Sequence, residues 1–178
     1  MHPRTPNPRG VGITIVGKVD VDHAGGTVAR RSRTVLIVRL NSTPVHWHSK
    51  KRNSAETSSF GSELVVMKQL CECIQGLACK LRMVGMSCEG PAHAHGDNQS
   101  ALANAKTLES TLKEKSLSLA CYLVREGVAM DDWRIARANA NENEADLLTK
   151  VLPFGEKRPK FVRKEFSHVC GSSWITQR

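Results

Sequence analysis

Residues 63–84, ELVVMKQLCECIQGLACKLRMV, form a long helical pattern that decides the arrangement of the chain. From Met67 onward, apolar residues recur three or four positions apart, which is the spacing of one helix face. These residues are Leu70, Ile74, Leu77, Leu81 and Val84. Glu63 lies four positions before Met67 and therefore continues the core-facing stripe. Because charged side chains are rarely buried unless they are paired or bind a metal, Glu63 is a candidate functional acid.

Three further acids fall where ordinary solvated surface explains them poorly. Asp20 lies inside an expected strand, Asp97 closes another strand and Asp146 enters a short helix. Each acid alone fits a strand end or a helix N-terminus, but the four together predict a metal site. Carboxylates held close together repel one another unless a cation neutralises them, and hard oxygen ligands favour Mg²⁺ or Mn²⁺. Two such ions about 4 Å apart can activate water for phosphodiester hydrolysis.

Strand and helix patterns alternate along the chain. The expected strands are residues 13–22, 34–40, 45–49, 92–97 and 133–137. The expected long helices are residues 57–84, 99–106 and 111–126, and Gly127 ends the last of these. A short helix is expected to run through residue 150, and Asn141 and Glu144 resemble a capping box at its start. Tight turns between the first three strands imply antiparallel pairing, and the later β-α-β order implies parallel strands. The predicted fold class is α/β, a mixed five-stranded sheet flanked by helices. If its first and fourth strands are neighbours, Asp20 and Asp97 project side by side.

The length of 178 residues suits one domain with a sizeable core. Residues 1–12 are rich in proline and read as a flexible arm, residues 13–153 form the domain, and residues 154–178 form a basic tail. The chain has 26 Lys+Arg against 17 Asp+Glu, a formal net charge of +9. A basic surface around an acidic site suits a polyanionic substrate, although solubility alone also explains such a charge.

Two basic groups are candidates for phosphate contacts. Lys50, Lys51 and Arg52 follow the third strand and open a polar loop, and Lys113 and Lys115 open the helix at 111–126. Phosphate contacts position a nucleic acid without reading its sequence. Aromatic residues are only 4% of the chain, so a base-stacking platform for single strands is not expected.

The six cysteines do not form a disulfide framework, because no C-x-x-C pair occurs and the N-terminus is polar rather than a signal peptide. No apolar run approaches the roughly 20 residues that span a bilayer. We therefore expect a reduced intracellular chain, in the cytoplasm or nucleus, with neither membrane contact nor a small-molecule cofactor. The histidine pairs 46/48 and 93/95 leave zinc as an alternative, but no cysteine with ligand spacing lies beside them.

Five ordered motifs carry a family resemblance. They are VDVDHAG at 19–25, PVHWHSKK at 44–51, SSFGSEL at 58–64, GDNQSA at 96–101 and ADLLTKVLP at 145–153. Over residues 13–153 they resemble the ribonuclease H domain of copia-type LTR retrotransposon Pol polyproteins. Any one motif alone is weak, whereas five in this order are specific.

The resemblance implies the ribonuclease H fold, dependence on Mg²⁺ or Mn²⁺, and cleavage of the RNA strand of RNA–DNA hybrids after reverse transcription. Matched by motif, Asp20, Glu63, Asp97 and Asp146 take the four metal-binding and catalytic positions, and Asp22 is a second acid without an assured role. Asn98 and Gln99 are expected beside the nucleic acid. A reverse transcriptase domain is the implied partner. Its palm is missing here, so the chain looks like a fragment or a remnant of a Pol polyprotein.

The chain also departs from the family pattern. Ser116 replaces the histidine of a Lys-His-Ile segment, Cys121-Tyr122 replaces a Tyr-His pair, and the glutamate motif reads Phe-Gly-Ser-Glu rather than Thr-Glu-Ala-Glu. These changes leave a second hypothesis open, a degenerate module of the same fold that holds nucleic acid without cutting it. A third, an integrase or resolvase core, is disfavoured by four acids in place of an Asp-Asp-Glu triad.

Overall fold

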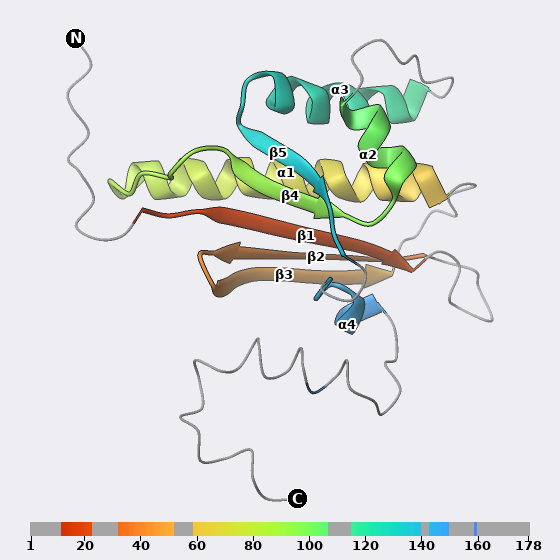
Figure 1. Ribbon diagram of the computed structural model, residues 1–178, viewed down its shortest axis with the longest axis horizontal. Helices are drawn as coiled ribbons and strands as arrows, with labels where there is room; N and C mark the ends of the chain where they lie inside the picture. Colours follow the sequence, from red (N-terminus) through yellow and green to blue (C-terminus); the bar gives the residue numbers. More distant parts are fainter. Residues whose placement is uncertain are drawn as a thin grey trace, which may run out of the picture.

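The computed structural model describes residues 12–22, 32–51, 59–106, 115–139 and 143–149, together with Pro159. The described strands form one mixed sheet in the order β3-β2-β1-β4-β5 (Figure 1). The pairs β1–β2 and β2–β3 are antiparallel, and β1–β4 and β4–β5 are parallel. The strands are β1 (Ile15–Asp22), β2 (Arg33–Leu40), β3 (Thr43–Lys51), β4 (Ala92–Gly96) and β5 (Trp133–Arg137). The predicted α/β fold with a mixed five-stranded sheet is confirmed.

Helices cover both faces of this sheet. They are α1 (Ser59–Met83), α2 (Gln99–Lys106), α3 (Lys115–Ala129) and α4 (Asp146–Thr149). The first three lie on one face, and the short α4 lies on the other, beside β1 and β2 (Figure 1). None of the helices in the described ranges is both long and apolar enough to cross a membrane. The arm at 1–12, apart from Gly12, and the tail at 154–178, apart from Pro159, lie outside the described residues.

The stripe of α1 packs against the sheet much as its spacing predicts. Met67, Leu70, Ile74 and Leu81 are buried in the main core. Gly17 of β1 lies directly beneath Leu70, and a Cβ there would lie 2.5 Å from its Cδ1 atom. Two predicted positions differ from the expectation. Leu77 is only partly buried, and Val84, which follows the last residue of α1, is 70% exposed.

Three element boundaries also correct the sequence interpretation. The strand expected to end at Ser49 continues to Lys51, since Lys50 and Lys51 pair with Thr34 and Arg33 of β2. These lysines are therefore strand residues and do not open a loop. The helix expected to stop at Gly127 runs on to Ala129, because Gly127 leaves room for the indole of Trp133.

The start of α4 is the third correction. A capping box between Asn141 and Glu144 is wrong for Glu144, whose carboxylate is buried in ion pairs with Lys18 and Arg39. Asn141 itself lies outside the described residues. The turn is held instead by Asn143, whose Oδ1 accepts a hydrogen bond from the Ala145 amide at 3.3 Å. Ala145 then packs between β2 and α4, against Val35, Ile37 and Leu148.

Candidate functional site: an acidic metal centre

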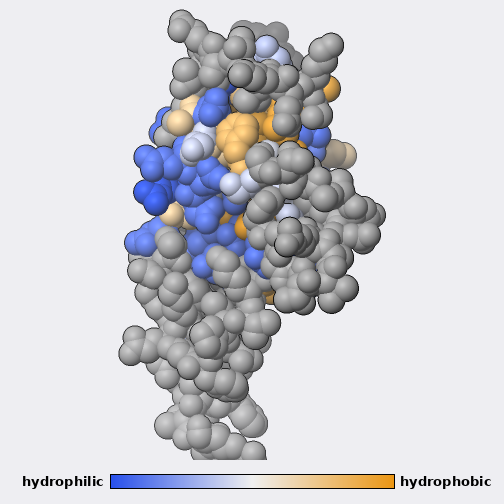
Figure 2. Space-filling model, turned by 90° about the vertical axis from the view of Figure 1, so that its right-hand side faces the viewer, coloured by the Kyte–Doolittle hydropathy of each residue, from blue (hydrophilic) through white to orange (hydrophobic). Residues whose placement is uncertain are grey.

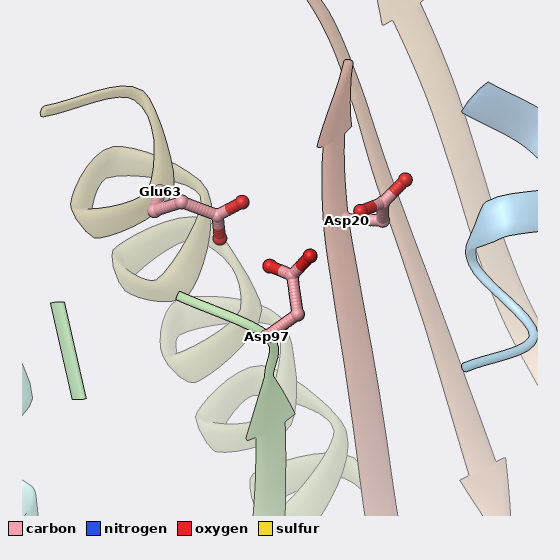
Figure 3. Close-up of side chains that lie close together, drawn as sticks. All are labelled: Asp20, Glu63 and Asp97. Carbon is pink, nitrogen blue, oxygen red and sulfur yellow. The ribbon is translucent and has the colours of Figure 1, made fainter. Parts of the chain in front are cut away.

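Three of the four predicted acids meet at one end of the sheet. Asp20 comes from β1, Asp97 follows β4 directly, and Glu63 comes from the first turns of α1 (Figure 3). Each offers one carboxylate oxygen, and these oxygens all lie within 4.8 Å of one another. β1 and β4 are parallel neighbours, with Lys18 opposite His95, so both strands bring their acids to the same edge.

Burial separates this cluster from an ordinary acidic surface. Asp20 is 1% exposed and Glu63 is 5% exposed, whereas Asp97 is partly exposed. Figure 2 views the molecule from this end, where hydrophilic residues gather below a smaller apolar patch. Three converging carboxylates repel one another unless a cation neutralises them. Their oxygen donors suit a hard divalent ion such as Mg²⁺ or Mn²⁺, so the residues present fit the metal that the sequence resemblance implies.

Asp146 lies outside this group of three. It is the first residue of α4, the short helix that packs on β1 and β2, and it is 8% exposed. Its backbone amide donates a hydrogen bond to the Asn143 carbonyl at 3.2 Å. The structure therefore supports a group of three acids directly, and the metal-binding role of Asp146 stays a prediction.

The residues predicted to contact nucleic acid are distributed over several elements. Asn98 caps α2, because its Oδ1 accepts hydrogen bonds from the amides of Ser100 at 3.0 Å and Ala101 at 3.1 Å. Gln99 is exposed at the first position of α2, and Lys50 and Lys51 are exposed on β3. Only the backbone of Lys115 is described, at the start of α3, and Arg52 and Lys113 lie outside the described residues.

The histidines form no second metal group among the described residues. His93 and His95 stack with ring centroids 6.4 Å apart on β4. Burial lowers the pKa of His95, and the neighbouring charges of Lys18 and His93 lower it further. The cysteines in the described ranges are free thiols, and burial raises the pKa of the Cys71 thiol, with Glu72 adding to the effect.

Sequence reasoning missed a buried polar group next to the acids. Glu144 is 0% exposed and pairs with Arg39 at 3.0 Å and Lys18 at 3.3 Å. Asn143 donates a hydrogen bond from Nδ2 to the carbonyl of Val19 at 3.0 Å. A signal was present in the sequence, because Arg39 lies on the same face of β2 as the buried residues Val35 and Ile37, and a buried cation needs an acidic partner.

No family model matches the chain. A curated relative is the "Retrovirus-related Pol polyprotein from transposon TNT 1-94" of Nicotiana tabacum, 26% identical over 137 residues. The match covers 77% of this chain and 10% of the relative, so the chain spans about a tenth of that polyprotein's length.

Solved structures resemble the fold at lower identity. The RNase H1 of the archaeon Halobacterium salinarum NRC-1 is 15% identical with a TM-score of 0.55, covering 76% of this chain and 93% of that one. LC11-RNase H1 in complex with an RNA/DNA hybrid is 14% identical with a TM-score of 0.57, at the same coverage. The foamy viral protease-reverse transcriptase in complex with an RNA/DNA hybrid is 12% identical with a TM-score of 0.51, covering 84% of this chain and 20% of that one.

The strand order, the helices on both faces and these neighbours define a ribonuclease H-like fold. The predicted resemblance to the ribonuclease H domain of a retrotransposon Pol polyprotein is confirmed by the tobacco relative together with this fold.

Proposed function

We propose that this chain is a metal-dependent ribonuclease H that hydrolyses the RNA strand of RNA–DNA hybrids. The observation that carries the proposal is the convergence of Asp20, Glu63 and Asp97, two of them buried, within 4.8 Å at the end of two parallel strands. The neighbours solved with RNA/DNA hybrids support hybrid as the substrate class. The retrotransposon Pol relative and the foamy viral protease-reverse transcriptase solved with hybrid support an intracellular role beside a reverse transcriptase.

In this proposal Asp20, Glu63 and Asp97 hold Mg²⁺ or Mn²⁺, and Asp146 serves as a fourth acid from the opposite face of the sheet. When bound, such ions would supply water activation and stabilisation of the leaving oxygen of the cleaved phosphodiester. The chain orients the acids through rigid elements. Asn98 fixes the backbone after Asp97 by capping α2, and the packing of α1 on β1 fixes the height of Glu63 above Asp20.

Cationic residues supply the grip on the substrate. Lys50 and Lys51 project from β3, and the chain carries a formal net charge of +9. Lys113 and Lys115 remain candidates for the same role at the start of α3. Phosphate contacts of this kind hold a duplex in register without reading its bases, as a nuclease that acts on any hybrid sequence requires.

One observation favours a second candidate function, a binding module that has lost its activity. Asp146 is not within the group formed by Asp20, Glu63 and Asp97, although the family motif places it at the metal. A domain with three acids in place and the fourth displaced would hold hybrid but cut it poorly or not at all.

A cleavage assay separates the two functions. We expect the purified chain to cut the RNA strand of an end-labelled RNA–DNA hybrid in Mg²⁺ or Mn²⁺, to leave double-stranded DNA intact, and to stop in EDTA. Asp97→Asn should abolish cleavage, since it removes one of three carboxylates. Asp22→Asn is the matched control, because Asp22 lies on the same strand as Asp20 and outside the cluster. Hybrid binding without cleavage in either metal would establish the binding module instead.

A further inference from the structure

Buried polar contacts fix the turn at residues 143–146 to the sheet. The proposed reaction assigns no role to these contacts. Glu144 is fully buried, with Oε2 3.0 Å from Nε of Arg39 and Oε1 3.3 Å from Nζ of Lys18. Arg39 also donates a hydrogen bond to the carbonyl of Ser42, in the turn between β2 and β3. One carboxylate thus connects β1 and β2 to the segment that leads into α4.

Such an arrangement is unfavourable in free energy unless its geometry is good. Removing an ion from water carries a large desolvation penalty, which a buried partner offsets only with well-placed atoms. Well-packed apolar side chains of similar volume often give equal or greater stability. Fold stability alone therefore explains Glu144 poorly. What an ion pair adds is a defined position, because its atoms must meet at one distance and direction.

Asn143 supplies a second, independent connection, and it leads toward the acidic cluster. Its Nδ2 donates to the carbonyl of Val19 at 3.0 Å, and Val19 immediately precedes Asp20 on β1. Its own carbonyl accepts the amide of Asp146 at 3.2 Å. Two hydrogen bonds through one residue therefore join the backbone beside Asp20 to the backbone of Asp146. Ala145, which directly precedes Asp146, is buried against Val35 and Ile37 of β2.

We propose that Asn143 and Glu144 are positioning residues for Asp146. Asn143 fixes the start of α4 relative to the strand that carries Asp20, and Glu144 prevents the turn from rotating by holding it to Lys18 and Arg39. This proposal rests on the proposed function, in which Asp146 is the fourth metal-binding acid. Neither residue touches the substrate or the metal; both act through the placement of the Asp146 carboxylate.

The test is a double-mutant cycle between Asn143→Ala and Asp146→Asn, with Mn²⁺ affinity and cleavage of the hybrid measured for each variant. We expect Asn143→Ala alone to lower Mn²⁺ affinity or kcat by roughly 10–100-fold, the range seen when residues that orient metal ligands are removed. KM for the hybrid should change little. In the Asp146→Asn background the same substitution should have almost no further effect, because its only functional route has already been removed.

Glu144→Gln provides a second variant of nearly the same shape, and Glu126→Gln on the exposed face of α3 is the matched control for charge removal. Thermal unfolding in metal-free buffer shows whether each variant folds. If Asn143→Ala does not fold, the same cycle is carried out with Glu144→Gln. The contrary result is that the positioning variant lowers Mn²⁺ affinity and kcat by the same factor in the unsubstituted chain and in Asp146→Asn. That result would mean a general structural role and would overturn the proposal.

The cycle also distinguishes this proposal from the proposed function. If the unsubstituted chain binds Mn²⁺ but cuts no hybrid, the nuclease assignment fails, while coupling in Mn²⁺ affinity still supports positioning. If the chain cuts hybrid and both positioning variants retain full kcat and Mn²⁺ affinity, positioning fails and the nuclease assignment stands. Failure of Asp146→Asn to change either quantity overturns positioning, because the residue to be positioned would then have no role.

Discussion

Asp97 is the most accessible of the three clustered acids, and it follows β4 at a point where Asn98 already holds the backbone. Neutralising it removes one negative charge from a crowded group without leaving a hole in the core. The two buried acids, Asp20 and Glu63, are less suited to substitution, since each is packed among other elements. Substitution of Asp97 therefore tests the repulsion among the three carboxylates with the least disturbance of packing.

We predict that Asp97→Asn unfolds at the same temperature as the unsubstituted chain, or at a higher one, in metal-free buffer, because relief of repulsion among the carboxylates favours the folded state. Addition of Mn²⁺ should raise the unfolding temperature of the unsubstituted chain and of Asp22→Asn, but not of Asp97→Asn. Differential scanning calorimetry with and without Mn²⁺ checks this. A marked loss of stability in metal-free buffer would show that Asp97 has a structural role instead.

The helix α1 is the element that connects the core to the site. Its N-terminal turns carry Glu63, and its middle packs on β1 through Leu70, which lies over Gly17. Leu77, two turns further on, is only partly buried. The apolar stripe therefore contributes unequally to the stability of the fold along its length. Its contribution is largest in the part that holds Glu63 at its height above the sheet.

We predict that Leu70→Ala destabilises the fold by about 2–5 kcal/mol, because a fully buried leucine leaves a cavity beneath the helix. Leu77→Ala is the matched comparison on the same face and should cost clearly less, at the lower end of that range or below it. Urea unfolding followed by circular dichroism measures both. Equal costs for the two substitutions would contradict the packing of α1 described above.

Over the whole chain, a formal net charge of +9 accompanies a site built from acids. Lys50 and Lys51 lie exposed on β3, which is an edge strand of the sheet. Exposed cations on an edge strand also discourage pairing with other strands, so their presence has an explanation without nucleic acid. Salt dependence of binding separates these two roles, since only phosphate contacts release counterions.

We predict that the double substitution Lys50→Gln and Lys51→Gln weakens hybrid binding at low salt by a similar factor for all sequences. The slope of log affinity against log salt should flatten by roughly one unit for each phosphate that the variant no longer binds. Lys80→Gln is the control, because Lys80 lies near the C-terminal end of α1, far along the helix from Glu63. An unchanged slope for the double variant would assign these lysines to protection of the edge strand alone.

Local periodicity in the sequence was enough to predict the main helix and the class of sheet. The stripe from Met67 to Leu81 predicted α1 and the inward face of Glu63, and the alternation of strand and helix patterns predicted the mixed sheet. These inferences succeeded because the side-chain periods of helices and strands are local and depend on near neighbours alone. Which strand lies beside β1 was not predicted, so the meeting of Asp20 with Asp97 followed only from the parallel pairing of β1 and β4.

Partners that lie far apart in the chain could be identified only from the three-dimensional fold. Arg39 and Glu144 are separated by 105 positions, and Asn143 and Val19 by 124, so no local pattern joins them. Packing likewise kept Gly127 inside α3 and carried β3 on to Lys51. The physical reason is common to all of these: a buried charge, a missing Cβ or an unpaired strand edge is satisfied by whatever the fold places against it, and the local sequence does not specify that neighbour.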